Sequence, residues 1–319
     1  THALIQNDVK FKKLGLVIID EQHRFGVNQR LRILEKGSNP HLMSMTATPI
    51  PRTLSITYHG DMDLSIIDEL PANRIPVTTK IVDQSKMGKV YDFIRNKIKL
   101  GRQAIVVYPL VEESEKSDLA AAVQNHELLS NVQFPKINVG LIHGKMKPQE
   151  KEEIINKFNK NKIKILVSTT VIEVGLDVPN ATIMIVEHAE RFGLTQLHQL
   201  RGRVGRGTEK SYCILVKRNQ SNVSRTRLEI MEKTNDGFLI ADEDLKLRGP
   251  GEVFGIKQSG FFQYKIADVV KDVKIIHEAR ELAFGLVKSD PTLNKKSNRY
   301  IKKIFRTKYS EYLENLKLI

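Results

Sequence analysis

The chain has 319 residues, 40% hydrophobic and 28% charged, and its 51 Lys and Arg against 37 Asp and Glu give a formal net charge of +14. This length suffices for two or three globular domains. No run of ~20 apolar residues occurs, so we expect no membrane span. The single cysteine, Cys213, excludes a disulfide framework or thiolate metal cluster within the chain and fits a reducing cytoplasm, with Cys213 as a small core residue. The basic excess favours polyanions, nucleic acid above all, as partners.

Short apolar runs alternate with amphipathic stretches up to about residue 216. Runs that are continuously apolar and rich in Val and Ile predict parallel strands covered on both faces. The stretch Pro148–Asn159 predicts a helix, because proline starts it, acids follow, and Ile154, Ile155 and Phe158 share one face. This alternation predicts an α/β doubly wound fold. The predicted strands are Leu16–Ile19, Ala104–Tyr108, Val139–Ile142, Ile165–Ser168, Thr182–Val186 and Tyr212–Val216.

Two changes in pattern suggest domain boundaries. Two prolines interrupt the pattern over residues 70–79, LPANRIPVTT, and obvious strands end after about residue 232. A helix is predicted over 266–288, where apolar residues recur at helical spacing. We therefore expect the end of one α/β domain at 1–74, a complete second one at 75–232, and a mostly helical region at 233–319.

The first chemical signal is the segment Leu14–His23, LGLVIIDEQH. Its buried strand ends in Asp20 and Glu21, which places two carboxylates at the edge of the sheet where ligands bind. One acid can hold Mg²⁺ and the other can orient an attacking water, although a solvated strand end would have the same sequence. Gln22 and His23 extend the pair to a DExH pattern and favour the functional interpretation.

The second signal is the segment Thr46–Arg52, TATPIPR. The hydroxyls of Thr46 and Thr48 can hydrogen-bond both an acidic site and a neighbouring loop. By itself the segment is equally typical of a strand that ends at a proline.

The third signal is the segment Ser168–Pro179, STTVIEVGLDVP, which follows an apolar strand. The hydroxyls of Ser168, Thr169 and Thr170 can bond a phosphate backbone without reading its sequence. A plain loop is the alternative.

The fourth and most specific signal is the segment Gln199–Arg206, QLRGRVGR. Glycines flank Arg203 and Arg206, so these side chains can reach a neighbouring domain with little steric hindrance. Guanidinium groups match phosphate geometry and stabilise transferred charge, which predicts an arginine finger rather than a solvated basic turn.

The order DEQH, TATP, STTVIEVGLDVP, QLRGRVGR resembles motifs II, III, V and VI of superfamily 2 helicases. Three longer segments resemble the RecG-type, ATP-dependent DNA helicases: DEQHRFGVNQR, residues 189–206 and DLKLRGPGEVFGIKQSG at 244–260. The last is similar to a translocation hairpin and loop that RecG shares with the coupling factor Mfd. The resemblance implies tandem RecA-like helicase domains, the first partial, with parallel sheets flanked by helices and then a mostly helical C-terminal region.

The resemblance also implies roles for individual residues. Asp20 would coordinate Mg²⁺, Glu21 would activate water, and the nucleotide phosphates would meet Gln199, Arg203 and Arg206. Gly175 and Asp177 would face the ATP cleft. Coupling of the nucleotide state to DNA would involve His23, Thr46, Thr48, Ser168, Thr169, Thr170, Arg248 and Gln258.

One departure from the family pattern concerns phosphate binding. No GxxxxGK[ST] loop occurs in the chain, and Gly88–Lys89 and Gly144–Lys145 are isolated pairs without the required spacing. The wedge domain of the family is absent as well. We therefore expect this chain by itself to bind nucleotide poorly and to hydrolyse little or none.

The expected function is the C-terminal motor portion of a monomeric helicase that remodels replication forks and migrates Holliday junctions in recombination and repair. An Mfd-like duplex translocase and a non-catalytic nucleic-acid-binding module remain as alternatives. A metal hydrolase is disfavoured, because the nine histidines are scattered and no HExxH occurs. The aromatic residues of the basic tail, among them Tyr300 and Phe305, are interpreted as helix packing rather than as a base-stacking surface.

Overall fold

In the computed structural model the described residues are 2–21, 25–47, 63, 65–69, 71, 74–109, 115–169, 178–218, 222–248 and 272–308. The chain divides into two compact units. The first comprises residues 1–48, 52–64 and 257–319, and the second comprises residues 49–51 and 65–256. Over these described ranges, no helix has both the length and the apolar character needed to cross a membrane.

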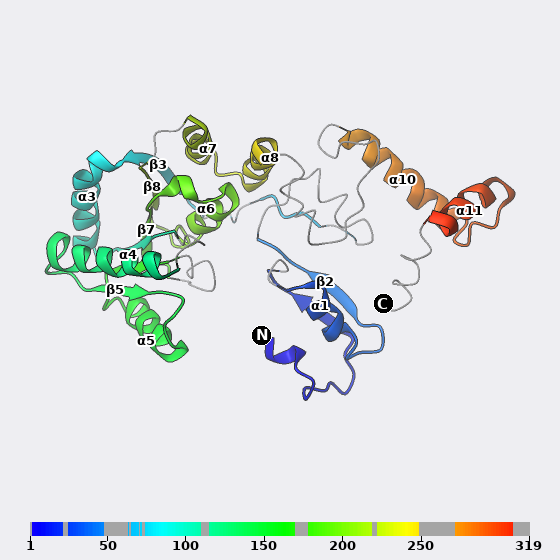
Figure 1. Cartoon of the computed structure of the whole chain (residues 1–319), viewed down its shortest axis with the longest axis horizontal. Helices are drawn as coiled ribbons and strands as arrows, with labels where there is room; N and C mark the ends of the chain where they lie inside the picture. The colour runs from blue at the N-terminus through cyan, green and yellow to red at the C-terminus, as the bar shows by residue number, and fades with distance from the viewer. Residues whose placement is uncertain are drawn as a thin grey trace. The chain divides into compact units, whose positions relative to one another are not determined.

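The second unit contains a six-stranded sheet in which every neighbouring pair is parallel (Figure 1). Its strand order is β3-β8-β7-β4-β6-β5, so the chain crosses over between most consecutive strands. The strands are β3 (Thr78–Asp83), β4 (Gln103–Val107), β5 (Val139–Ile142), β6 (Ile165–Ser168), β7 (Ala181–Val186) and β8 (Tyr212–Lys217).

Helices cover both faces of this sheet. Side chains alternate along β4, so that Ala104 and Val106 join the core on one face while Ile105 and Val107 join the core on the other. The first face is covered by α3 (Met87–Lys99) and by the segment after α4 (Glu115–Leu128), including the π-helical turn Leu129–Gln133. The opposite face is covered by α5 (Pro148–Asn159), α6 (Leu194–Arg201), α7 (Asn222–Lys233) and α8 (Gly237–Arg248).

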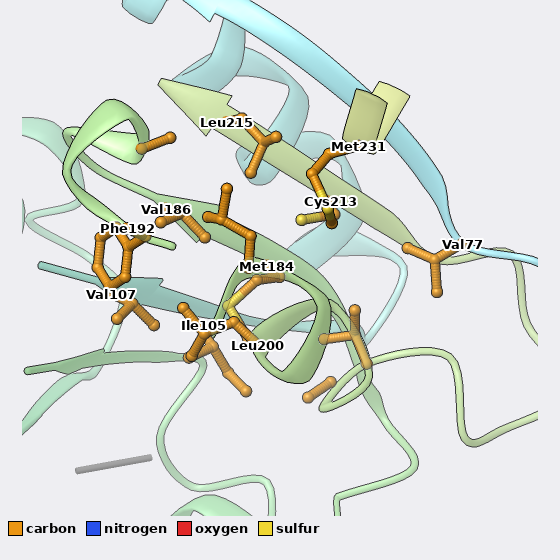
Figure 2. Close-up of a cluster of buried hydrophobic side chains, with 14 of the residues drawn as sticks. Val77, Ile105, Val107, Met184, Val186, Phe192, Leu200, Cys213, Leu215 and Met231 are labelled. Carbon is orange, nitrogen blue, oxygen red and sulfur yellow. The ribbon is translucent and has the colours of Figure 1, made fainter. Parts of the chain in front are cut away.

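Figure 2 shows the larger core, where side chains from β4, β7 and β8 meet those of α6 and α7. Cys213 is fully buried there, as predicted, and burial raises the pKa of its thiol to about 12. The thiol is therefore a core group rather than a reactive one.

The predicted α/β fold is confirmed in the second unit. Five predicted strands correspond to β4, β5, β6, β7 and β8 with bounds that differ by one residue at most, and α5 begins and ends at the predicted residues. The strand β3 was not predicted, because its sequence TTKIVD is polar and it follows the proline-rich segment. As an edge strand, β3 needs to bury only one side along much of its length.

The described N-terminal part of the first unit has a two-stranded parallel sheet of β1 (Leu16–Ile19) and β2 (His41–Ser44) joined through α1 (Val27–Leu34). A short 3-10 turn, η1 (His2–Ile5), precedes it. The prediction that β1 is covered on both faces is wrong for the described residues: Val17 and Ile19 are buried, but Leu16 and Ile18 are 53% and 57% exposed. The apolar run predicted the bounds of β1 correctly, but it did not predict that one face of the strand is exposed.

The C-terminal part of the first unit contains α10 (Val273–Ser289) and α11 (Arg299–Lys308), joined through the turn η7 (Lys296–Asn298). The predicted helix over 266–288 is confirmed from Val273 onward, and residues 266–271 lie outside the described residues. Two further short turns in the second unit are η3 (Gln84–Lys86) and η6 (Ala189–Arg191).

Candidate functional site

The acidic pair lies directly after β1, as the sequence predicted. Asp20 is exposed, and its Oδ1 accepts a hydrogen bond of 2.8 Å from the backbone amide of Glu21. Glu21 has a φ of 50°, a left-handed conformation that costs a residue with a side chain on the order of 1 kcal/mol. Glu21 therefore departs from the extended conformation of β1 at the start of the turn.

The threonine segment lies beside this acidic pair. Because β1 and β2 are parallel neighbours, their carboxyl ends meet at one edge, and the Met45 amide donates to the Ile19 carbonyl at 2.7 Å. The Glu21 carboxylate accepts a longer contact of 3.4 Å from the Ala47 amide, next to the exposed Thr46. The structure therefore brings together two signals that the sequence separates by more than twenty residues.

The donor set at this edge fits a magnesium ion. Mg²⁺ prefers one or two carboxylate oxygens, keeps several waters and completes its shell with substrate phosphates. Asp20 supplies an exposed carboxylate at the carboxyl end of a parallel strand, and Glu21 supplies a second carboxylate beside it. Binding of a metal here would leave room for water and phosphate in its coordination shell.

The arginine motif lies at the end of α6. The helix begins at Leu194, where the Gln196 side chain accepts a 3.1 Å hydrogen bond from the Gly193 amide. It ends at Gly202, and Gly205 has a φ of 80°, in the left-handed region that favours glycine. A β-carbon at Gly205 would lie 2.7 Å from the Val77 side chain, so the tight turn requires glycine for space as well.

The side chains of this turn differ in burial. Val204 is completely buried, whereas Arg206 is exposed and Gln199 and Arg203 are partly exposed. The Arg206 Nε lies 3.5 Å from the Gly202 carbonyl, at the limit of a hydrogen bond. Burial of Val204 anchors the loop, while Arg206 is exposed and Arg203 stays partly exposed.

A third arginine of the same motif, Arg201, has a different position that the sequence interpretation missed. Its side chain is 3% exposed and donates hydrogen bonds to the carbonyls of Met231 and Thr234, at 3.0 and 2.8 Å, at the end of α7. It also donates to the His198 Nδ1 at 3.0 Å. Arg201 thus satisfies terminal helix carbonyls and ties the arginine turn to α7.

The position of Arg201 could have been found from spacing. Leu194, Leu197 and Leu200 form the buried stripe of α6, and Arg201 continues it one turn beyond Leu197. An arginine in such a stripe has to find internal acceptors, which marks it as a positioning residue.

His198 is held neutral by this arrangement. Burial lowers its pKa to about 4, and the neighbouring Arg201 charge acts in the same direction. Because Arg201 donates to Nδ1, that nitrogen is the acceptor and the proton of the neutral ring is on Nε2.

The hydroxyl segment follows β6, and its described members are buried. The Ser168 hydroxyl donates to the Thr169 carbonyl at 2.5 Å, and the Thr169 amide donates to the Ile142 carbonyl at 3.3 Å. Ser168 and Thr169 are 0% and 1% exposed. Among the described residues, the Thr169 hydroxyl oxygen has no hydrogen-bond partner. The buried Thr169 hydroxyl therefore lies at the carboxyl end of β6.

A buried ion pair at the same edge of the sheet was also missed. Glu187 directly follows β7, is 2% exposed, and accepts a 3.0 Å hydrogen bond from Arg218, which follows β8. Burial raises the pKa of Glu187, while Arg218 opposes the shift. The signal was available, because Glu187 is an acid placed directly after an apolar strand, as Asp20 is after β1.

Several predicted site residues lie outside the described residues: His23, Thr48, Thr170, Gly175, Asp177 and Gln258. Arg248 is the last residue of α8, and its side chain is also outside them. The acidic pair belongs to the first unit and the arginine turn to the second.

Two known families match the chain. Residues 85–208 match the helicase conserved C-terminal domain, and residues 234–310 match domain 3, C-terminal, of the ATP-dependent DNA helicase RecG. The first match spans α3 to the arginine turn, and the second begins after α7 and includes α8, α10 and α11.

Individual relatives are similar over nearly the whole chain. The ATP-dependent DNA helicase RecG of Synechocystis is 53% identical over 96% of the chain, and that of Bacillus subtilis is 52% identical over 91%. The chain spans 37% and 42% of the length of these relatives.

Solved structures share the fold. A structure of RecG bound to a three-way DNA junction aligns with a TM-score of 0.67 at 46% identity, over 86% of this chain and 35% of that one. A DUF1998 helicase, MrfA, bound to DNA aligns with a TM-score of 0.51 at 19% identity, over 73% of this chain and 36% of that one, which supports the fold alone.

Proposed function

Because the chain belongs to the RecG family of helicases, we propose that it supplies the C-terminal motor portion of an ATP-dependent DNA helicase that remodels branched DNA. Replication-fork regression and Holliday-junction migration, in recombination and repair, are the processes we assign to it. The observation that carries the proposal is the pair of motifs DEQH and QLRGRVGR, present intact in a chain about 50% identical to RecG helicases. Mere electrostatic DNA binding would need neither motif.

The proposed domains follow from the motifs and from the predicted boundaries. Residues 1–74 would be part of a first RecA-like motor domain, 75–232 a second one, and 233–319 a translocation hairpin with a helical C-terminal region. Movement would come from closure of the two motor domains on ATP and their reopening after hydrolysis. A monomer suffices for this cycle.

Residues of both motifs, DEQH and QLRGRVGR, would contribute to ATP hydrolysis. A bound Mg²⁺ would neutralise phosphate charge, and Asp20 is the residue that would hold it. Glu21 would orient the attacking water, and its contact with Ala47 would report the nucleotide state to the Thr46 segment. Gln199, Arg203 and Arg206 would bind the phosphates, with the two arginines stabilising the charge that develops during transfer.

The remaining predicted site residues, some of them outside the described ranges, complete the proposal. Gly175 and Asp177 would line the nucleotide cleft. The DNA-coupling group would comprise His23, Thr46, Thr48, Ser168, Thr169, Thr170, Arg248 and Gln258.

A chimaera provides the test, because the chain spans only part of its relatives' length. This chain would replace the matched segment of the Synechocystis relative, and ATP hydrolysis would be measured with forked DNA and with linear duplex of equal length. We expect a clear preference for the fork, and a loss of about 10³-fold or more in the Arg203→Ala variant. Arg225→Ala is the matched control, since Arg225 is an exposed arginine that pairs with Glu229 on α7.

The outcomes separate the alternatives. Equal stimulation by fork and linear duplex would replace the proposal with an Mfd-like duplex translocase. Absence of DNA-stimulated hydrolysis in the chimaera, with the unmodified relative active, would leave a non-catalytic nucleic-acid-binding module.

The isolated 319-residue chain is expected to hydrolyse ATP poorly, because its sequence has no GxxxxGK[ST] loop. Steady turnover by the purified chain that disappears in Glu21→Ala would contradict this expectation.

A further inference from the structure

The helix α11, RYIKKIFRTK, has two chemically different faces. With 100° per residue, its four basic residues before Lys308 lie within an arc of about 100°. Tyr300, Ile301, Ile304 and Phe305 lie on the opposite side. The basic residues are Arg299, Lys302, Lys303 and Arg306.

The surroundings of α11 add positive charge and do not neutralise it. Residues 291–308 contain seven Lys and Arg and no Asp or Glu. Within the described residues, no ion pair involves any of these seven cations. Elsewhere on the chain, exposed lysines and arginines of α5, α7 and α8 pair with a glutamate on their own helix. The cations of α11 therefore differ from an ordinary solvated helix surface.

The connection that leads into α11 is ordered by one buried carboxylate. Asp290 is 6% exposed and accepts hydrogen bonds from the amides of Asn294 and Lys295, at 3.0 and 2.8 Å, and from the Asn298 side chain at 3.0 Å. Lys302 donates from α11 back to the Asn294 side chain. The start of the helix is thus fixed relative to α10, and the basic face is presented by an ordered hairpin rather than by a loose tail.

The chemistry of this face matches a polyanion with regularly repeated charges. Cations three and four residues apart follow one another along the helix every 5–6 Å, and lysine and arginine bind phosphate oxygens without reading sequence. The opposite face of α11 is apolar and suits packing against protein. An amphipathic basic helix can also bind anionic lipid, but the described part of α11 has ten residues, about three turns, and affinity for a membrane scales with the apolar area.

We propose that the basic face of α11, formed by Arg299, Lys302, Lys303 and Arg306, is a sequence-independent binding surface for the phosphate backbone of double-stranded DNA, separate from the helicase motifs. The choice of duplex DNA as the partner rests on the proposed function, whereas the location of the binding surface rests on the basic face of α11. It gives the motor a second contact with duplex DNA.

Salt dependence of DNA binding tests the proposal directly. Each phosphate neutralised by a cation adds about 0.9 to the slope of log affinity against log salt concentration. The full 319-residue chain would be titrated with fluorescent linear duplex at several salt concentrations, together with Lys303→Gln/Arg306→Gln. We expect the slope of this variant to fall by about 2, and its affinity at 0.1 M salt to fall by about 10- to 100-fold.

The matched control is Lys160→Gln/Lys162→Gln. It removes the same charge from two exposed lysines between α5 and the amino end of β6, and its slope should stay at the wild-type value. Circular dichroism of each variant checks that the helices persist. The charge reversal Lys303→Glu/Arg306→Glu should weaken binding further than the glutamine variant.

The possible results are distinct. An unchanged slope in a folded Lys303→Gln/Arg306→Gln variant, with wild-type chain that binds DNA, would overturn the inference and leave the proposed function standing. Failure of the wild-type chain to bind duplex even at low salt would count against the proposed function itself. Equal loss in the control variant would show a diffuse effect of charge and overturn the inference. If vesicles of 30% phosphatidylserine compete with DNA for α11, and the same variant no longer binds them, a lipid surface would replace DNA as the partner.

Discussion

Three arginines within six residues have three different environments, although the sequence QLRGRVGR presents them as one motif. Arg203 and Arg206 follow the end of α6 and face outward to different degrees, whereas Arg201 is buried and bonded to α7. The difference arises because the helix continues to Arg201 and the chain then turns at Gly202. Residue type therefore determined the chemistry available, and position on the helix determined which arginine became structural.

Substitution of Arg201 by methionine should destabilise the second unit by about 2 kcal/mol. The variant keeps most of the apolar stem but leaves the Met231 and Thr234 carbonyls without their donor, which costs about 1–3 kcal/mol for buried groups. Urea denaturation measures the free energy of unfolding. Arg206→Met is the matched control and should change stability by less than about 0.5 kcal/mol, because Arg206 is exposed. Equal effects of the two variants would refute the positioning role of Arg201.

His198 should make stability fall in mild acid. Its folded pKa of about 4 lies below the usual 6.5, so the folded state binds fewer protons than the unfolded state between these values. This contribution is complete above pH 6.5 and is lost as the pH falls toward 4, by at most about 3 kcal/mol. His198→Gln keeps an acceptor for Arg201 but cannot titrate. The variant should show a shallower decline of unfolding free energy between pH 6.5 and 4, and parallel curves would rule out His198 as the cause.

At the scale of elements, the turn after α6 restricts which residue can occupy position 205. The left-handed φ of Gly205 and the 2.7 Å approach of its missing β-carbon to Val77 both exclude a side chain. Val77 immediately precedes β3, so the arginine turn packs against the entry of an edge strand. The position of Arg206 therefore depends on a contact between segments more than a hundred residues apart.

Gly205→Ala should destabilise the second unit by about 2 kcal/mol, from left-handed strain of about 1 kcal/mol and a clash of similar size. Gly88→Ala is the control: Gly88 lies in α3 with open space around it, so alanine should stabilise by up to about 1 kcal/mol. Thermal unfolding would measure both variants. Tolerance of alanine at 205 would mean that the turn is not held against Val77.

The whole chain divides into units with unequal cores. The second unit buries side chains on both faces of a six-stranded sheet. In the described N-terminal part of the first unit, Val17 and Ile19 of β1 and Ile33 of α1 are buried, whereas Leu16 and Ile18 are exposed. Stability within a chain follows the density of buried apolar contacts. The acidic pair and the arginine turn are therefore supported to very different extents.

Native-state hydrogen exchange should reveal this difference. Amides of β4 and β7 should exchange only on global unfolding of the second unit, and those of β1 and β2 at least about 100-fold faster, which corresponds to about 3 kcal/mol. Mass spectrometry of peptides from the two units measures both rates in one sample. Equal protection of β1 and β4 would contradict the inference from burial.

Much of the fold followed from the sequence, because buried parallel strands and an amphipathic helix have strong local patterns. The bounds of β5, β6 and α5 were predicted to the residue, and the order of the chemical segments predicted a helicase motor. The edge strand β3 was not predicted, because a strand that buries few side chains has few apolar residues in its sequence.

Only the tertiary structure decided how the chemical residues are supported. It placed Glu21 beside Ala47 through the pairing of β1 with β2, and it separated buried Arg201 from partly exposed Arg203. It also paired Glu187 with Arg218 across adjacent strand ends. The sequence by itself determined which groups can bind phosphate and metal, because that depends on side-chain chemistry and local spacing. Which groups are buried, paired or free to meet a ligand depends on contacts between distant segments, and local patterns do not encode those contacts.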